Sequence, residues 1–245
     1  MTSVWDSIWE RYGDDIKVNE TYLWKFYESL LEKFDFKNKS VVELGCGTGF
    51  NSIIMAMKGA HVTFLDQSRQ ALNFVKKNLD KLSLDAEFVQ KNIFDFNGGD
   101  FDLCHSEGVI EHYLDGKRQE IVDIHANSIK KGGRVLIIVP NRKNIFYRIG
   151  KFLAESTNTW IYGGEYPYSE AELVKRIQKA GLIPQRVLGG ELVFSIRTLA
   201  SPLILKSSLF TKRVVEPVNH RTFRINYNNF IANKFGKIIG CVARK

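Results

Sequence analysis

A short glycine-rich turn after an apolar strand constrains this chain more than any other part of its sequence. Residues 41–50 read Val-Val-Glu-Leu-Gly-Cys-Gly-Thr-Gly-Phe, with glycine at positions 45, 47 and 49. Glycines in such a turn let the backbone approach a ligand without a clash with Cβ, and the helix that follows offers free N–H groups. The stretch therefore predicts a strand, a ligand-binding turn and a helix in succession.

Strand and helix patterns alternate through the surrounding residues 39–140. Apolar, β-branched runs predict strands at 40–44, 61–65, 86–90, 101–105 and 134–139. Helical spacing predicts helices at 51–57, 69–79 and 117–130, with Ser68 as the N-cap of the second and Gly132-Gly133 as the stop of the third. Such alternation is typical of an α/β fold with a doubly wound, mostly parallel sheet.

The residues next to the turn indicate which ligand it binds. A dinucleotide fingerprint requires Gly or Ala at position 50, where this chain has Phe50. Glu43 precedes the turn, where a carboxylate repels a diphosphate but suits a ligand that carries an ammonium and a sulfonium. Asp66 ends the next predicted strand, 23 positions later, where a carboxylate accepts hydrogen bonds from ribose hydroxyls. We therefore expect S-adenosylmethionine as the cofactor and disfavour a nicotinamide.

With this turn the chain resembles the class I S-adenosylmethionine-dependent methyltransferases, in particular the small-molecule group known as type 11, over roughly residues 38–140. The resemblance implies a seven-stranded, Rossmann-like sheet. It also implies that Asn92, which stands where the family usually has Asp, contacts the adenine without the charge of a carboxylate. The residues expected to bind the cofactor are Glu43, Gly45, Cys46, Gly47, Gly49, Asp66, Gln67, Asn92, Ile93, His105 and Ser106.

Residues 104–112, Cys-His-Ser-Glu-Gly-Val-Ile-Glu-His, stand where the family faces the transferable methyl group. The Asn/Asp-Pro-Pro-Tyr/Phe signature of enzymes that methylate nucleic-acid bases is absent, which ranks that activity lower. If the acceptor is a hydroxyl or a carboxylate, the candidate catalytic residues are Glu107, His112 and Tyr166. A hydrogen-bonded structural role is the alternative for His112, and we expect a structural role for His125.

The remaining sequence predicts the organisation around this core. A single methyltransferase domain is expected over residues 1–245, because this length supports one core with a small cap. Aromatic residues at helical spacing predict a helical cap of two helices over 1–36, ahead of a cofactor-binding core over 38–140. A helix at 169–180 opens with a capping box and ends at Gly181, and 237–242 predict a last strand. Residues 141–168 and 190–236 are then substrate-side insertions.

Charge is unevenly distributed along the chain. Residues 1–140 carry 17 Lys and Arg against 21 Asp and Glu, whereas residues 141–245 carry 18 against 6. A basic amphipathic helix within residues 141–153 fits a peripheral membrane contact or a lipid-like substrate, and an ordinary packed helix is the alternative. We expect O- or C-methylation of a small or lipid-like acceptor with an anionic part. An RNA or other nucleic-acid methyltransferase and a non-catalytic cofactor-binding accessory protein are the alternatives.

Other features exclude several classes of protein. No apolar run approaches the length that a membrane span needs, and Asp6 and Glu10 interrupt any signal peptide. The three cysteines, Cys46, Cys104 and Cys241, lack metal-ligand spacing, so we predict no metal site and a reduced, cytoplasmic protein. The sequence does not predict the oligomeric state.

Overall fold

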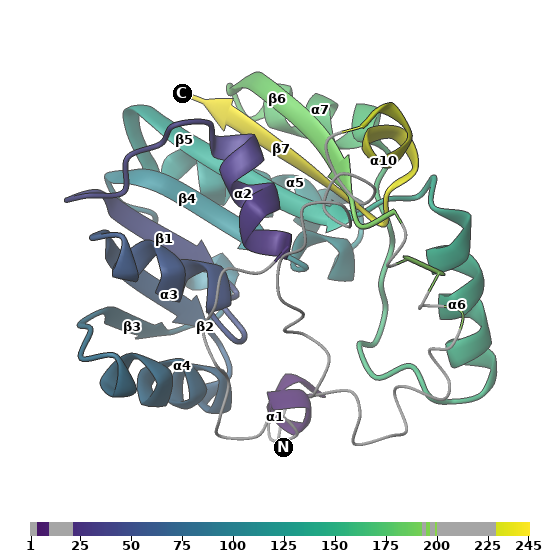
Figure 1. The fold of residues 1–245 in the computed structure, drawn as a ribbon, viewed down its shortest axis with the longest axis horizontal. Helices are drawn as coiled ribbons and strands as arrows, with labels where there is room; N and C mark the ends of the chain where they lie inside the picture. The colour runs from purple at the N-terminus through teal and green to yellow at the C-terminus, as the bar shows by residue number, and fades with distance from the viewer. Residues whose placement is uncertain (1–3, 10–21, 193–194, 197–198, 200–228) are drawn as a thin grey trace.

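Seven strands form a single sheet in the computed structural model, which describes residues 4–9, 22–192, 195–196, 199 and 229–245. The strands are β1 (Ser40–Leu44), β2 (His61–Asp66), β3 (Glu87–Gln90), β4 (Phe101–Glu107), β5 (Ile129–Pro140), β6 (Ile183–Gly190) and β7 (Ile238–Arg244). Their order is β3-β2-β1-β4-β5-β7-β6. Strands β1 to β5 pair in parallel, and β7 is antiparallel to both neighbours (Figure 1). The predicted doubly wound, mostly parallel fold is confirmed.

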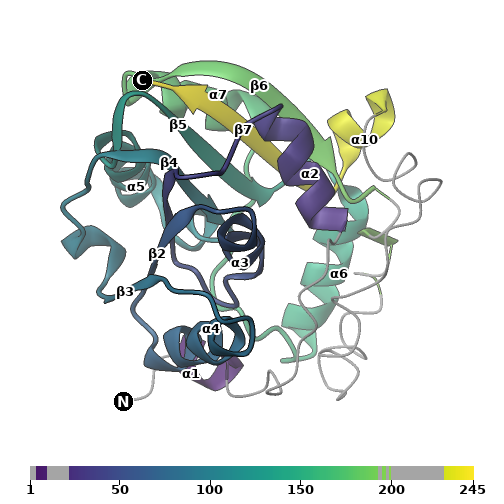
Figure 2. The same cartoon turned by 60° about the vertical axis from the view of Figure 1, so that its left-hand side comes forward.

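Helices cover both faces of the sheet. They are α1 (Val4–Trp9), α2 (Tyr22–Leu31), α3 (Phe50–Met57), α4 (Arg69–Lys81), α5 (Asp115–Asn127), α6 (Ile145–Ser156), α7 (Glu170–Lys179) and α10 (Phe230–Phe235), with 3-10 turns η1 (Ile93–Asp95) and η2 (Ile110–His112). Helices α2, α3 and α4 pack on one face, and α5 and α7 pack on the other. Helix α1 lies beside α4, and α6 stands apart from the sheet (Figures 1 and 2).

Side-chain alternation along the strands divides the core into two clusters. Val41 packs among α2, α3 and α4, whereas its neighbour Val42 packs among α5 and α7. This period of two follows from the pleat of a strand. On β4, Leu103 belongs to the first cluster and Cys104 to the second. The same alternation decides which of the polar side chains that follow on β4 share a face.

The predicted helix caps are confirmed. The Ser68 hydroxyl accepts from the backbone N–H of Ala71 at the start of α4, and that of Ser169 accepts from Glu172 at the start of α7. Gly181, at φ +77°, follows the end of α7 in the left-handed region that favours glycine.

Two local predictions were wrong. The helix predicted at 117–130 spans Asp115–Asn127, and Gly132-Gly133 lies within β5 instead of stopping a helix. Pairing of Ile129 with Phe101 starts the strand early, and no local pattern reveals such a contact. The sequence pattern also did not locate β6, because most of its residues are exposed or half-buried and the alternation is weak.

The outer segments are described only in part. The two helices predicted over 1–36 are present as α1 and α2, and most of the predicted insertion at 190–236 lies outside the described residues. In the described ranges, none of the helices has the length and apolar character that a membrane crossing requires.

Candidate active site

The glycine turn leads from β1 into α3 at the carboxyl edge of the sheet. Gly45, Gly47 and Gly49 have φ values of +70°, +51° and +62°, which disfavour any other residue. A Cβ at Gly45 would lie 2.8 Å from a methyl group of Val109, and one at Gly47 would lie 2.6 Å from the ring of Trp9. The turn therefore needs glycine both for its conformation and for the close approach of other groups.

Asp66 fastens this turn from the end of β2. One oxygen of its carboxylate accepts from the backbone N–H of Gly47 at 2.9 Å, and the other accepts from Ser68 at 2.8 Å. Each oxygen keeps lone pairs for a further donor. Burial raises the pKa of Asp66 while these two N–H groups act to lower it. The arrangement places a carboxylate directly beside the glycine turn, as the sequence predicted.

Gln67 and Asn92 lie together beyond Asp66. The side-chain amide of Asn92 donates to Oε1 of Gln67 at 3.3 Å, and its oxygen accepts from the backbone N–H of Phe94 at 3.1 Å. Both side chains are exposed, but Ile93 is 6% exposed and packs in the apolar cluster beneath α5. The structure therefore brings the two polar residues of the predicted adenine end together and places Ile93 in the core.

Glu43 and His105 lie side by side on β1 and β4. His105 Nδ1 is 4.0 Å from Oε1 of Glu43, and Ser52 on α3 is 2.8 Å from His105 Nε2. Burial raises the pKa of Glu43 to about 8 and lowers that of His105 to about 3, so the imidazole is neutral. Oε2 of Glu43 is buried and has no hydrogen-bond partner among the residues that the structure describes. An unpaired buried carboxyl oxygen fits a cationic ligand that completes its contacts.

Glu107 continues the same row of β4 side chains. Its Oε2 accepts from Tyr27 of α2 at 3.3 Å and from Nδ2 of Asn51 at 3.1 Å. Burial and, to a smaller extent, the charge of Glu191 raise the pKa of Glu107 to about 7. Because Asn51 is the second residue of α3, this carboxyl is tied to the helix that the glycine turn starts.

Ser106 points to the opposite face of the sheet. Its hydroxyl lies 2.9 Å from Nε2 of His125, whose Nδ1 lies 2.7 Å from the carbonyl oxygen of Ile121. Burial lowers the pKa of His125 to about 4. His125 is fully buried with a partner at each ring nitrogen, as expected of a structural residue, and His105 and Ser106, which were predicted to bind the cofactor, are buried as well.

Two further buried carboxyl groups lie near Glu107. Glu111, in η2, is 2% exposed, and one of its oxygens finds no hydrogen-bond partner within the described part of the chain. Glu165 is 9% exposed and accepts from the hydroxyl of Tyr147 on α6. Burial raises the pKa of both carboxyl groups, and their mutual repulsion adds to the effect on Glu111. The carboxyl edge of the sheet is therefore acidic and desolvated.

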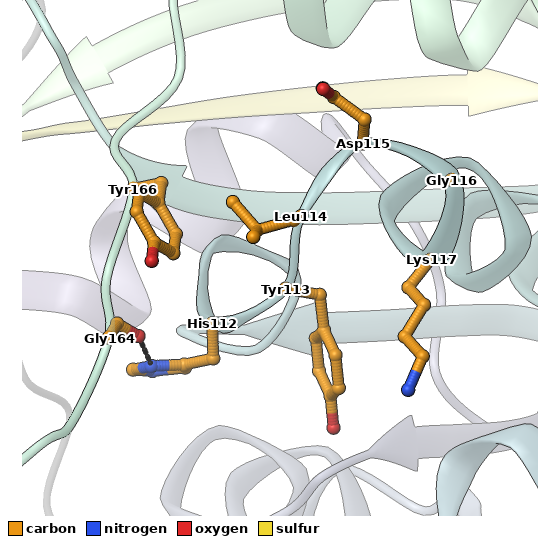
Figure 3. Close-up of a pocket in the computed structure, with 8 residues that line it drawn as sticks. All are labelled: His112, Tyr113, Leu114, Asp115, Gly116, Lys117, Gly164 and Tyr166. Carbon is orange, nitrogen blue, oxygen red and sulfur yellow. Dashed lines mark hydrogen bonds between the residues drawn. The ribbon is translucent and has the colours of Figure 1, made fainter.

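His112 and Tyr166 line a pocket of about 550 Å³ between the start of α5 and the loop that contains Gly164 (Figure 3). Nδ1 of His112 lies 2.9 Å from the carbonyl oxygen of Gly164, so this nitrogen donates the hydrogen bond when the ring is neutral. Burial lowers the pKa of His112. Tyr166 is 44% exposed. Both predicted residues thus share one pocket, and Glu107 is not among the residues that line it.

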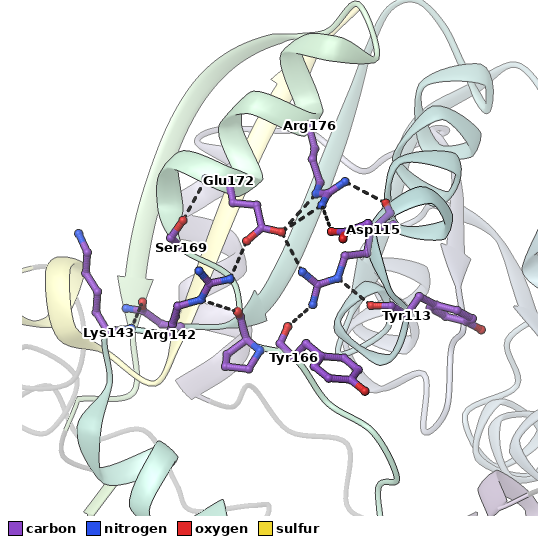
Figure 4. Close-up of polar contacts among 11 residues, drawn as sticks. Tyr113, Asp115, Arg142, Lys143, Tyr166, Ser169, Glu172 and Arg176 are labelled. Atoms are coloured by element: carbon purple, nitrogen blue, oxygen red, sulfur yellow. Dashed lines mark hydrogen bonds and ion pairs between the residues drawn. The ribbon is translucent and has the colours of Figure 1, made fainter.

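An arginine that the sequence analysis missed holds the walls of this pocket. Nε of Arg118 donates to the carbonyl oxygen of Tyr113 at 2.7 Å, and another nitrogen donates to that of Tyr166. Its third contact is an ion pair with Glu172 at 2.8 Å, and Glu172 also binds Arg142 and Arg176 (Figure 4). The guanidinium lies over the Tyr168 ring. Nothing in the local sequence marks Arg118, because its partners lie up to 54 residues away.

Helix α1 covers the space between the glycine turn and the pocket. Trp9 lies over Gly47, Trp5 meets the His112 ring edge-on at 4.8 Å, and Asp6 accepts from Ser68 at 2.5 Å. The predicted helical cap therefore contacts both predicted parts of the site. In the described residues, no group of three or more His, Cys, Asp and Glu side chains is arranged to hold a metal ion.

Comparison with known proteins agrees with this geometry. A family model described as a methyltransferase domain matches residues 35–181. The ubiquinone biosynthesis O-methyltransferase of Aromatoleum aromaticum is 28% identical over 158 residues, which are 62% of this chain and 67% of that protein. The enzyme of the same name from Vibrio parahaemolyticus is 27% identical over 168 residues, 65% of this chain and 71% of that protein. The alignments thus leave about a third of each relative unmatched.

A solved structure shows the same fold over almost the whole chain. Magnesium protoporphyrin IX methyltransferase from Synechocystis PCC 6803, with S-adenosylhomocysteine bound, has a TM-score of 0.62. The match covers 98% of this chain and 93% of that one at 16% identity. Identity this low shows likeness of fold alone.

Proposed function

This chain belongs to the methyltransferase-domain family and is an S-adenosylmethionine-dependent methyltransferase, and we propose that it methylates a hydroxyl oxygen of a small molecule. The environment of Glu107 supports oxygen as the methylated atom. Glu107 is a buried carboxyl group with a pKa of about 7, and Asn51 ties it to the start of α3 by a hydrogen bond. A hydroxyl acceptor must lose a proton during methylation, and a base with a pKa near 7 suits that task.

We assign the cofactor to the carboxyl edge of β1 and β2. The glycine turn lies at this edge, the remaining lone pairs of Asp66 suit the ribose hydroxyls, and Gln67 and Asn92 suit the adenine end. The unpaired oxygen of Glu43 suits the positive charge of the ligand. When bound, S-adenosylmethionine supplies an electrophilic methyl group on sulfur.

The residues of this chain then position the acceptor and receive its proton. Burial keeps water away, and most of the acceleration comes from holding the two reactants in line. Glu107 would then receive, on a carboxyl oxygen, the proton that the acceptor hydroxyl loses on methylation. His112 and Tyr166 border the pocket from which the acceptor approaches.

The names of the relatives support a small acceptor and oxygen as its methylated atom. The anionic or lipid-like character of the acceptor stays a prediction from the basic second part of the chain. We also propose a cytoplasmic location, which is supported by three cysteines that are free and buried. Nucleic-acid methylation and a non-catalytic accessory role are not favoured.

Two measurements test the proposal. Calorimetric titration with S-adenosylmethionine, S-adenosylhomocysteine and NAD should show binding of the first two and none of the third. Incubation with cofactor labelled in the methyl group and a panel of phenols, catechols, amines and RNA should label hydroxyl acceptors. Label in amines or RNA alone would overturn the choice of oxygen, whereas the absence of S-adenosylmethionine binding would overturn the cofactor assignment.

A further inference from the structure

Helix α6 turns an apolar face to solvent. Its exposed positions include four large apolar side chains: Ile145 at 60%, Ile149 at 43%, Phe152 at 66% and Leu153 at 39% exposure. The inward face consists of Tyr147, Gly150 and Ala154, all buried. Spacing of three and four residues places the exposed set on one side of the helix. A helix packed only for stability would expose its polar side chains instead.

Helix α10 extends this apolar surface. Phe230, Ile231 and Phe235 are 75%, 57% and 43% exposed. The two helices are joined where α6 begins, because the side-chain amide of Asn144 donates to the carbonyl oxygen of Phe235 at 2.8 Å. Both helices lie on the same side of the molecule (Figures 1 and 2). We call these seven side chains, on α6 and α10, the apolar patch.

The charges around the apolar patch are almost all positive. Lys143 and Arg148 are exposed and make no ion pair with the described residues, and the ammonium of Lys234 lies 5.6 Å from the ring centres of both Phe230 and Phe235. The sole carboxylate on the two helices is Glu155, and Lys151 neutralises it. Exposed apolar side chains bordered by cations match the interface of an anionic bilayer.

The apolar patch includes the outer side of α6, and the inner side of the same helix contacts a residue of the candidate site. Tyr147 on the inner side of α6 donates to Glu165, whose charge acts on Glu111. Helix α6 also follows β5 at the carboxyl edge of the sheet, where the glycine turn and Glu107 lie. If a membrane bound the outer side of α6, the acceptor side of the enzyme would lie close to lipid.

From these observations we propose that α6 and α10 form a docking surface for anionic lipid membranes. The apolar side chains enter the boundary between headgroups and acyl chains, and Lys143, Arg148 and Lys234 contact the acidic headgroups. Such binding is peripheral and reversible, since it combines a limited apolar area with a few charges. The proposal goes beyond methyl transfer, which requires no membrane.

Vesicle sedimentation of the full chain tests the proposal. The protein should sediment with vesicles of equimolar phosphatidylcholine and phosphatidylglycerol, and not with phosphatidylcholine alone. Rising salt should weaken the binding, because screening acts on the contribution of the cations. No binding to the acidic vesicles, or equal binding to both kinds, would overturn it.

Matched variants locate the surface. The double variant Ile149→Ser/Phe152→Ser should bind acidic vesicles about ten-fold more weakly. Ile183→Ser removes an equally exposed side chain, 64% exposed at the far end of β6 from α10, and should bind unchanged. Arg148→Glu should weaken binding about five-fold or more, whereas Lys175→Glu, at an exposed position of α7, should not. Equal effects of target and control would overturn the assignment.

Three readouts keep the outcomes distinct. Circular dichroism tests whether each variant is folded. If the double serine variant is unfolded, Arg148→Glu and the salt dependence still test the membrane proposal. Light scattering over a range of concentrations tests whether the apolar patch instead pairs two copies of the chain. A dimer that dissociates in Phe152→Ser, together with no binding of the protein to vesicles, would overturn the membrane proposal. Methyl transfer to a water-soluble acceptor should be the same in all these variants, so its loss would concern the proposed function instead.

Discussion

The hydroxyl of Tyr27 lies 3.3 Å from Oε2 of Glu107 and equally far from Nδ1 of His105. The neutral His105 carries one hydrogen, and a chain of donors runs from Ser52 through His105 and Tyr27 to the carboxylate if that hydrogen is on Nδ1. A residue of the N-terminal cap therefore supports the carboxyl group that we propose as proton acceptor.

Tyr27→Phe should make methyl transfer more sensitive to acid. The hydroxyl stabilises the ionised form of Glu107, so its loss raises the pKa of that carboxyl above about 7. The acid limb of the pH profile for kcat/KM should move to higher pH, with several-fold lower activity near neutrality. Tyr168→Phe is the matched control, since the buried Tyr168 hydroxyl has no hydrogen-bond partner in the described ranges. An unshifted limb in Tyr27→Phe would remove Tyr27 from this role.

Glu107→Gln should abolish the acid limb and lower kcat by about 10² to 10⁴-fold, the usual contribution of a general base. Calorimetry should find the affinity for S-adenosylmethionine little changed, because we assign Glu107 to the acceptor side. Glu120→Gln, at an exposed position of α5, provides the control. Retained kcat with Glu107→Gln would mean that positioning alone drives the transfer.

Glu43→Gln should stabilise the protein without ligand at alkaline pH. The folded pKa of Glu43 is about 8 against an ordinary 4.5, so folding favours its protonated form. Stability from this group is full below pH 4.5 and is lost as the pH rises toward 8. Gln never ionises, and near pH 8 it should raise the free energy of unfolding by about 2 to 4 kcal/mol in denaturant titrations. Equal free energies of unfolding at pH 8 for Glu43→Gln and the unchanged protein would contradict the raised pKa of Glu43.

The same substitution tests the contact of Glu43 with the cofactor. A sulfonium and an ammonium near the carboxyl favour its ionised form, so binding near neutral pH should release protons. Calorimetry in two buffers of different ionisation enthalpy measures that release, which should be smaller with S-adenosylhomocysteine and absent in Glu43→Gln. If proton release were the same for S-adenosylmethionine, for S-adenosylhomocysteine and for the Glu43→Gln variant, the charge of the ligand would lie away from Glu43.

The features that were predictable from sequence are those in which the partners are close along the chain. The glycine turn, the acidic end of β2 and the cap at Ser68 each depend on a few consecutive residues. Tyr27 and Glu107 are 80 residues apart, and no local pattern pairs them. The alternation of strand β4 did contain one usable signal, since it separates the side of His105 and Glu107 from that of Ser106.

Asp66→Ala should weaken S-adenosylmethionine binding by about 1 to 3 kcal/mol, through loss of hydrogen bonds from the ribose to a charged acceptor. It also leaves the N–H groups of Gly47 and Ser68 without their acceptor. Asp66→Asn keeps the shape and one acceptor oxygen, so its loss of affinity should be smaller. Unchanged affinity in calorimetry for both variants would exclude Asp66 from the cofactor site.

Arg118→Met should destabilise the pocket more than the ion pair alone suggests. Arg118 is 4% exposed, and its removal strips two carbonyl groups, those of Tyr113 and Tyr166, of their donor. Glu172 keeps Arg142 and Arg176, so it is not left as an isolated buried charge. The expected cost is therefore about 3 kcal/mol, at the lower end for breaking a buried pair.

Arg142→Met removes a partner of the same Glu172 and serves as the control. The Arg142 side chain is 54% exposed, and exposed pairs contribute less than about 1 kcal/mol. Thermal melts should separate the two variants clearly. Because Arg118 joins the walls that carry Tyr113 and Tyr166, its loss should also raise KM for the acceptor while leaving the Kd of S-adenosylmethionine unchanged. Equal changes in both constants would mean that the pocket held by Arg118 does not select the acceptor.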